Sequence, residues 1–262
     1  MATARIIRFV LRSCMAAMFC LLVVSARAEE VTVRLGYSEI PAPPWQIGHD
    51  QSPPGIAFEV IREVRARLGI RFEFIRYPNK RVLWALGKNE LEGAFMYSYE
   101  PERTRQGVYP ERNGLPDPSR RLATLSYYLY RMKGEPVIWD GKTVRGGNIV
   151  IGANEGYSIA EDLRQLGLKV FEARGTEKGF RMLQLGRISA MAHQDCVADP
   201  WLAAHDPEGK IEKLEPPLRT KHYYLIFSHA FMEKHRDLAM KIWDEIAVVR
   251  DAVMAKAMKR YQ

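Results

Sequence analysis

Hydrophobic residues in the first half of this chain switch repeatedly between the period of a strand and that of a helix. Apolar and polar residues alternate over 31–37, where Val33 and Leu35 would share one face of a strand. Apolar residues then recur at helical spacing over 57–68. The same patterns predict a strand over 71–77, a short helix over 79–87 and a strand over 93–98. Repeated strand–helix–strand units predict an α/β arrangement with a largely parallel sheet.

A second set of alternating elements begins near Asn148. The patterns predict a strand over 148–153, a helix from 159, a strand over 169–173, a helix over 177–185 and a strand over 188–193. Residues 109–121 show no period and are predicted to form a loop. Two helices whose apolar stripe includes Leu238 and Ile242 are predicted to end the chain.

Two tyrosine-rich, β-prone runs lie on either side of this second set and suggest how the chain divides. If both runs cross between lobes, 125–132 and 222–228 are hinge strands. The first lobe then consists of 29–124 and 229–262, and the second lobe of 133–221. Lobes joined by paired strands can close around a ligand. The alternative is one continuous domain in which both runs are ordinary core strands.

The first 28 residues have the composition of a cleavable signal peptide. Basic residues precede an apolar run over 15–25, and Ala26-Arg27-Ala28 supplies a small-x-small cleavage pattern. The apolar run is too short to span a bilayer comfortably. We expect cleavage after Ala28 and export to the periplasm; a retained anchor is the alternative.

Cleavage changes the charge and the cysteine count of the chain. The segment carries four arginines and no acidic residue, so its loss lowers the formal net charge from +8 to +4. The remaining charges are scattered, which does not indicate a nucleic-acid partner. Only Cys196 of the three cysteines would remain, so no intrachain disulfide is expected. The hydrophobic content of 47% allows a packed core instead.

Several short motifs follow one another in an informative order. They are Pro43-Pro44-Trp45, Gly55 to Gly69, Leu86-Gly87 to Gly93, Pro101-Glu102-Arg103, Glu155-Gly156-Tyr157-Ser158, Gly186-Arg187-Ile188 to Asp195, and Tyr223 to Ser228. In this order and spacing the mature chain resembles the bacterial periplasmic solute-binding proteins of ABC transporters, specifically the polar amino-acid-binding family. The resemblance implies an α/β, two-lobe periplasmic-binding-protein-like fold of type II, with a ligand cleft between the lobes.

Arg103 is the first candidate for ligand binding. A guanidinium held at a strand end can bind a carboxylate through two parallel hydrogen bonds. The resemblance implies that Arg103 binds the ligand's carboxylate and that Ser98 supports the same group. Tyr97 and Tyr99 flank Ser98 and, by strand alternation, point to the opposite face, as ligand contacts or as core packing. Glu100 stands where the family usually has a small hydroxyl residue.

The second lobe is expected to supply the opposite wall of the cleft. Tyr157 and Ser158 precede a helix whose free N–H groups favour an anion, with Ser158 as the N-cap. The resemblance places a second carboxylate contact there, and implies that Asp195 binds the ligand's ammonium group. Asp199 is the alternative acid. Arg103 and Asp195 would then form a clamp on opposite lobes that selects a zwitterion.

Two further ligand contacts are predicted. The resemblance places Trp45, held by two prolines, over the ligand's side chain, and a structural role in the loop is the alternative. Arg81 lies at a helix start and could reach a second ligand acid, although a surface role is also open. The cluster of His193, Asp195 and Cys196 lacks a second ligand pair at metal spacing, so neither a metal nor a cofactor is expected.

These features predict a monomeric binding protein without catalysis. It would capture a small polar or zwitterionic ligand, an amino acid or a related carboxylate, in the interlobe cleft and deliver it to an ABC transporter permease. An exported enzyme similar to the cyclohexadienyl dehydratases is the alternative, with Glu155 or Asp195 as a proton shuttle. A third hypothesis is an accessory or sensory module that passes a binding signal to a membrane partner.

Overall fold

Eight strands form one sheet through the part of the chain that the structure describes. The computed structural model describes residues 31–261, so the expected signal peptide over 1–28 lies outside them. The sheet order is β10-β9-β11-β6-β12-β3-β1-β2. Its strands are β1 (Thr32–Ser38), β2 (Arg71–Tyr77), β3 (Gly93–Ser98), β6 (Ala123–Met132), β9 (Val150–Asn154), β10 (Lys169–Ala173), β11 (Ala190–Gln194) and β12 (Ile211–Phe227).

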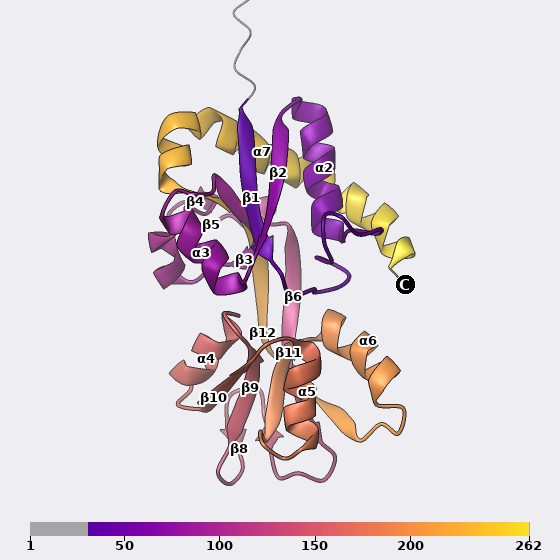
Figure 1. Cartoon of the computed structure of the whole chain (residues 1–262). Coiled ribbons are helices and arrows are strands. Elements are labelled where there is room, and N and C mark those ends of the chain that lie inside the picture. Colours follow the sequence, from indigo (N-terminus) through magenta and orange to yellow (C-terminus); the bar gives the residue numbers. More distant parts are fainter. Residues whose placement is uncertain (1–30, 262) are drawn as a thin grey trace, which may run out of the picture. The chain divides into compact units, whose positions relative to one another are not determined.

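Strand direction divides this sheet into three parts. β1 pairs in parallel with β2 and β3, which together form the first strand set. β9 pairs in parallel with β10 and β11, which form the second strand set. β6 and β12 lie antiparallel to each other in the centre, and Figure 1 shows them running from one set to the other. The predicted α/β arrangement is confirmed, and its parallel pairing is confined to the two outer sets.

The helices follow the sequence pattern with a few differences. They are α2 (Ile56–Leu68), α3 (Asn79–Gly87), α4 (Ile159–Gln165), α5 (Thr176–Gln184), α6 (Asp195–His205) and α7 (His229–Ala257). α2 ends at Gly69, whose left-handed backbone (φ 64°) suits a residue without a side chain. The two predicted C-terminal helices form one element, α7, with non-helical backbone angles at His235. The helix α6 was not predicted, and it contains Pro200, a residue that disfavours a helix interior.

Short elements fill the connections. The predicted loop over 109–121 contains a hairpin and a 3₁₀ turn. The elements are η1 (Pro101–Arg105), β4 (Glu111–Arg112), β5 (Leu115–Pro116), η2 (Pro118–Arg120), β7 (Ile138–Trp139), β8 (Val144–Arg145) and η3 (Met258–Arg260).

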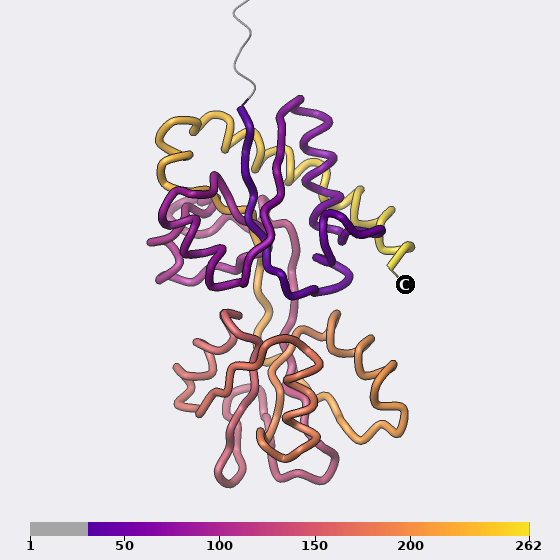
Figure 2. The backbone as a smooth tube through the Cα atoms, in the orientation of Figure 1, coloured from indigo at the N-terminus to yellow at the C-terminus, as the bar shows by residue number. Residues whose placement is uncertain are grey.

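Figure 2 shows how the backbone visits the two strand sets. The chain builds the first set, crosses in β6, builds the second set, returns in β12 and ends in α7. Thr32–Gln262 form one unit by their contacts. Within residues 31–261, no helix combines the length and apolar character that crossing a membrane requires.

Each strand set packs helices onto an apolar face. One buried cluster joins α3 to β3 and β12 through Leu86, Tyr97 and Ile226. The other joins α5 and α6 to β6 and β11 through Phe180 and Met191, among others. Two cores of this kind hold the ends of the strands in fixed positions on both sides of the central pair.

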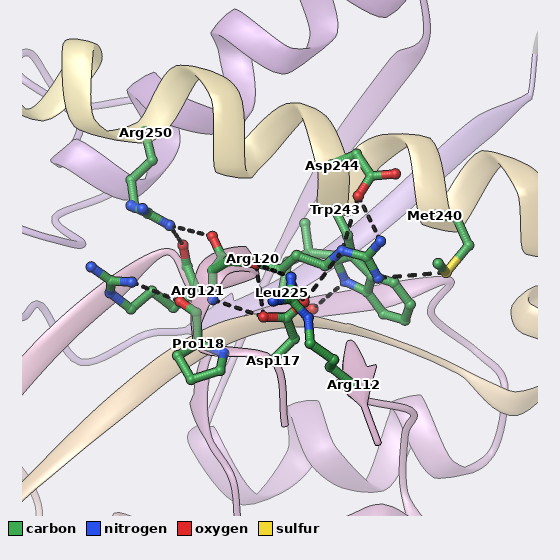
Figure 3. A network of polar contacts seen from close by, with 11 residues as sticks. Arg112, Asp117, Pro118, Arg120, Arg121, Leu225, Met240, Trp243, Asp244 and Arg250 are labelled. Carbon is green, nitrogen blue, oxygen red and sulfur yellow. Dashed lines mark hydrogen bonds and ion pairs between the residues drawn. The ribbon is translucent and has the colours of Figure 1, made fainter. Parts of the chain in front are cut away.

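Polar contacts attach α7 to the sheet and to the 117–121 segment, as Figure 3 shows. The buried Arg250 donates Nη1 hydrogen bonds to the carbonyl oxygens of Ser119 (2.8 Å) and Arg121 (2.7 Å). Trp243 Nε1 donates to the Leu225 carbonyl of β12 at 2.8 Å. Because buried backbone carbonyls need partners, these bonds fix the position of the helix against the returning strand.

Candidate functional site

A small cavity lies where the carboxyl ends of several strands meet the central pair. Its volume is about 40 Å³. The lining residues come from both strand sets, and they are Ser38, Ala42, Gln46, Asn79, Phe95, Met96, Tyr97, Ser98, Arg103, Tyr127, Gly156, Tyr157, Ser158, Gln194 and Tyr223. Carboxyl ends of parallel strands are the usual ligand position in open α/β sheets. The cavity is therefore the candidate ligand site.

Arg103 is the one charged residue that lines this cavity, among the residues that the structure describes. It lies in η1, directly after β3. Its Nη1 donates to the carbonyl (3.1 Å) and the hydroxyl (3.3 Å) of Ser98, and its Nη2 donates to the carbonyl of Gly156 at 3.0 Å. Its guanidinium carbon lies 5.7 Å from the centre of the Tyr97 ring. All three hydrogen bonds of the guanidinium thus go to neutral oxygen atoms. A ligand carboxylate would be a stronger acceptor than any of them.

Two buried serine hydroxyls meet beside this arginine. Ser98 Oγ, from β3, lies 2.8 Å from Ser158 Oγ, at the start of α4. Ser158 occupies the predicted N-cap position, but its hydroxyl does not cap the helix. It contacts Ser98 and the ammonium group of Lys221 (3.1 Å) instead. The N–H groups of Ala160 and Glu161 bond to backbone carbonyl oxygens at 3.1 Å each, so this end of the helix offers the cavity mainly the Ser158 hydroxyl.

Tyr97 and Ser98 both line the cavity, although they are consecutive residues of β3. Tyr97 packs in the buried cluster on α3 together with Tyr99, whereas the hydroxyl of Ser98 contacts Ser158. A ligand contact of either tyrosine stays a prediction, and β3 has a bulge just before them. Tyr224 of β12 pairs with Tyr97 and the next residue of β12 pairs with Phe95, so Met96 is the extra residue. Met96 has φ 63°, a left-handed conformation that is uncommon for a residue with a side chain. Bulges of this kind often re-aim side chains at functional sites.

Gly156 joins the two strand sets through its carbonyl oxygen. This oxygen accepts hydrogen bonds from Arg103 and from Asn79 Nδ2 (2.8 Å), both in the first set. Asn79 in turn accepts the Tyr97 hydroxyl at 2.8 Å. Gly156 has φ 73°, and an added Cβ would lie 2.7 Å from Asn79 Nδ2. Glycine is required here both for the backbone angle and for the close approach.

Lys221 connects the two strand sets through charge. Its Nζ lies 2.6 Å from Glu100, after β3, and 2.5 Å from Asp162, in α4. The three side chains are only 12%, 12% and 14% exposed. Sequence patterns drew attention to Glu100 but not to Lys221 or Asp162. Lys221 lies two residues before Tyr223 in β12, so strand alternation could have placed both on the cavity side. The sequence around Lys221 does not indicate which acids it pairs with.

A buried cluster of two phenols and an amide forms another wall. The hydroxyls of Tyr127 and Tyr223 lie 2.7 Å apart, and Gln194 Nε2 donates to both at 3.1 and 2.8 Å. Burial raises the pKa of both phenols above their usual value, so they stay neutral. Both tyrosines belong to the predicted tyrosine-rich runs, but no site role was predicted for them or for Gln194.

Asp195 is not among the cavity-lining residues. β11 ends at Gln194, which lines the cavity, and α6 begins at Asp195. Asp195 Oδ1 accepts the backbone N–H of Cys196 at 2.8 Å. Burial and the nearby carboxylate raise the pKa of the Cys196 thiol to about 12, which disfavours the reactive thiolate. A contact between Asp195 and a ligand stays a prediction.

Three other predicted residues also lie away from the cavity. Trp45 is 6% exposed, and its Nε1 has no hydrogen-bond partner within 31–261. The ring of Tyr99 packs edge-on against Tyr109, with centroids 5.3 Å apart. The guanidinium of Arg81 lies over a neighbouring tyrosine ring, 4.5 Å from its centre. The cavity thus gathers five predicted residues, Arg103, Ser98, Tyr97, Tyr157 and Ser158.

His193 precedes Gln194 in β11 and has a structural role. Its Nδ1 faces the carbonyl of Gln194, so Nε2 is the acceptor for Asn154 Nδ2 (3.1 Å) and for the Thr176 hydroxyl (3.0 Å). Burial lowers the pKa of His193 to about 4, which keeps the ring neutral. Within the described range, no group of three or more His, Cys, Asp or Glu side chains is arranged to hold a metal ion.

Comparisons with known proteins identify the fold. The ligand-binding core of GluR0 from Nostoc punctiforme, in complex with L-glutamate, is 17% identical, with a TM-score of 0.68 over 87% of this chain and 98% of that one. An ancestral arginine-binding protein bound to arginine is 17% identical, with a TM-score of 0.67 over 88% and 97%. The arginine-, lysine-, histidine-binding protein ArtJ from Geobacillus stearothermophilus is 18% identical, with a TM-score of 0.65 over 88% and 95%.

These similarities are structural and span nearly the whole of each chain. No protein-family model and no curated protein matches the sequence. The predicted α/β fold, two lobes of the type II periplasmic-binding-protein kind, is thereby confirmed. The cavity around Arg103 lies between the two strand sets of this fold.

Proposed function

We propose that this protein is a periplasmic solute-binding protein that captures an amino acid or a related small carboxylate around Arg103 and delivers it to an ABC importer. One observation carries the proposal. A single fixed guanidinium lies between two buried hydroxyls and a helix start, with contacts to both strand sets. Charged hydrogen bonds contribute about 1.5–3 kcal/mol each, and a bidentate pair also fixes the orientation of a carboxylate.

Capture requires the two lobes to separate first. A volume of about 40 Å³ has room for a few water molecules but not for an amino acid. A ligand carboxylate would take the place that the Gly156 carbonyl occupies at Arg103 Nη2. The lobes would then close on the ligand, with the Ser158 hydroxyl on its far side.

The end of β11 supplies the second half of the proposed clamp. Gln194 reaches the cavity with its amide, and Asp195 follows it directly. We propose that a ligand ammonium draws the Asp195 carboxylate away from the N–H of Cys196. The lobe boundaries follow the same proposal: 29–124 with 229–262, and 133–221, joined by the hinge strands 125–132 and 222–228.

The geometry gives no support to the dehydratase alternative. Among residues 31–261, no carboxylate lines the cavity in its closed form, and the Asp195 carboxylate is proposed to bind a ligand ammonium rather than to move a proton. Glu155, one of the two candidate shuttles, is engaged in ion pairs with Lys80 (3.3 Å) and Arg174 (3.1 Å). We therefore propose binding without catalysis.

A thermal-shift screen of amino acids, dicarboxylates and small amines, followed by calorimetry, tests the proposal. We expect a carboxylate to raise the melting temperature and to lose at least 100-fold in affinity with Arg103→Ala. Arg105→Ala is the matched control, because Arg105 is exposed two residues away and makes no ion pair among the described residues. Wild-type affinity in Arg103→Ala would overturn the site. Uptake of the labelled ligand by cells with and without the gene tests delivery.

A further inference from the structure

A wide groove of about 1040 Å³ opens beside α5 and α6, separate from the cavity at Arg103. The two helices lie side by side in Figure 1, and a ring from each is in stacking contact. Of the residues that the structure describes, none lines both sites. The loop after β1 separates them, with Ile40, Pro41 and Pro43 on the groove and Ala42 on the cavity.

The groove has an apolar floor. One face of α5 contributes Met182 and the following Leu185, and one face of α6 contributes Pro200 and Trp201. Leu185 is 56% exposed, so it adds accessible apolar surface to the floor beside the partly buried Met182. The volume lies at the upper end of the range for sites that hold small molecules, and such sites are mainly apolar with a few polar groups.

Stacked rings make one wall of the groove rigid. Trp201 lies between Phe180 (centroids 4.9 Å apart, planes at 11°) and His205 (4.5 Å, 8°). The ring of His205 is held in place, because its Nδ1 hydrogen-bonds to the carbonyl of Trp201 at 2.8 Å. Since these rings are already fixed, a flat or flexible apolar body can pack against them at little entropic cost.

The rim of the groove is strongly cationic. Four basic residues line it, Arg174, Lys178, Arg181 and Arg187, against one acid, Glu177. Arg174 has an ion pair outside the groove, but Lys178, Arg181 and Arg187 have none among residues 31–261. Lys178 and Arg181 lie three residues apart on α5 and therefore project from the same side of the helix. Unpaired cations above an apolar floor favour a ligand that combines both characters.

We propose that this groove is a second binding site, for a small amphipathic anion: a carboxylate or sulfonate attached to an aromatic or alkyl body. The acidic group binds Lys178 and Arg181, and the apolar body packs on Leu185 and the Trp201 stack. The proposal does not depend on the function proposed for Arg103, because the two sites share no lining residue.

Fluorescence titration of the mature protein with 1-anilinonaphthalene-8-sulfonate tests this site, because that probe joins a sulfonate to fused rings. We expect one saturable site per chain under conditions where the protein is fully folded. Lys178→Glu/Arg181→Glu should weaken binding at least 10-fold. The control Arg236→Glu/Lys241→Glu makes the same charge change on exposed positions of α7 and should leave the affinity unchanged.

Two further measurements distinguish this groove from the cleft at Arg103 and from an interface between copies of the chain. Arg103→Ala should leave probe affinity unchanged, and a loss there would place the probe in the cleft and overturn the proposal. Equal affinity in wild type and Lys178→Glu/Arg181→Glu would also overturn it, given melting temperatures that show both proteins folded. Sedimentation is the last check: a dimer that this double variant dissociates would mean that a second copy covers the groove, which contradicts a small-molecule site.

Discussion

Replacing Lys221 by methionine tests how the two strand sets are held together. Methionine keeps the unbranched apolar chain and removes only the ammonium, which leaves Glu100 and Asp162 without their shared cation. Because all three side chains are 12–14% exposed, breaking this group is close to breaking a buried ion pair, which costs about 3–5 kcal/mol. Allowing for the remaining exposure, we expect about 3 kcal/mol.

The control variant lies in the same strand. Lys213 of β12 pairs with Asp199, but these side chains are 30% and 44% exposed. Both residues lie beside the second strand set, so their pair does not connect the two sets. Exposed pairs contribute about 0–1 kcal/mol, so Lys213→Met should cost less than about 1 kcal/mol. The difference between the two variants isolates the contact that spans the two sets.

Urea unfolding and small-angle scattering together measure the effect. Lys221→Met should lower the free energy of unfolding by about 3 kcal/mol and increase the radius of gyration of the ligand-free protein. About 3 kcal/mol corresponds to roughly 100-fold in the equilibrium between closed and open lobes, and the scattering measurement follows this shift in the ligand-free protein. If Lys221→Met and Lys213→Met have equal effects, the ion group does not hold the lobes closed.

Two more changes test the walls of the cavity. Gly156→Ala should lower the free energy of unfolding by about 2 kcal/mol, because the new side chain is strained at positive φ and crowds Asn79. The control is Gly167→Ala, which has φ 76° and no atom within 4 Å of the added Cβ, so it should cost only the strain of about 1 kcal/mol. Equal losses of stability in urea unfolding would contradict the close approach at Gly156. Burial lowers the pKa of His193 to about 4, while the unfolded chain binds the proton near pH 6.5, so stability should fall by about 3 kcal/mol as the pH drops from 6.5 to 4. His193→Gln should remove that part of the slope, and an unchanged pH profile of unfolding would show that the imidazole is not held neutral.

Periodicity predicted the elements because strands and helices are patterned over short distances. Predicted and observed strands overlap in both sets, and the tyrosine-rich runs become the central strands β6 and β12. Arg103 could be found because its turn is a local motif that follows a strand. Contacts such as Lys221 to Asp162 join residues that no short-range pattern relates, so only the fold shows them.

The position of Asp195 shows how one residue of register decides a site. The predicted strand covers 188–193, whereas β11 spans Ala190–Gln194. Alternate residues of a strand face opposite sides, so a small shift exchanges the residue that reaches the cavity. Gln194 takes that position, and Asp195 becomes the first residue of α6.

Whether Asp195 completes the clamp can be decided by the charge of the ligand. Within 31–261, the one hydrogen bond that Asp195 makes is to the N–H of Cys196, and losing such a bond costs about 1 kcal/mol. Pairing with a ligand ammonium contributes about 1.5–3 kcal/mol, so turning the carboxylate toward the cavity is favourable. Without that turn, an ammonium would lie near the guanidinium of Arg103 with no counter-charge, which is costly in a buried site.

An amino acid and its 2-hydroxy acid analogue should therefore differ by about 0.5–2 kcal/mol, or roughly 2- to 30-fold in dissociation constant, in favour of the amino acid. Calorimetry with wild type and Asp195→Asn measures this preference, which the variant should abolish without weakening the hydroxy acid. Asp199→Asn is the control, because Asp199 already pairs with Lys213 away from the cavity. If wild type binds the hydroxy acid as tightly as the amino acid, the Asp195 carboxylate keeps its hydrogen bond to Cys196 and does not contact the ligand. The site around Arg103 is then built for simple carboxylates, with Gln194 and the two phenols as its remaining polar contacts.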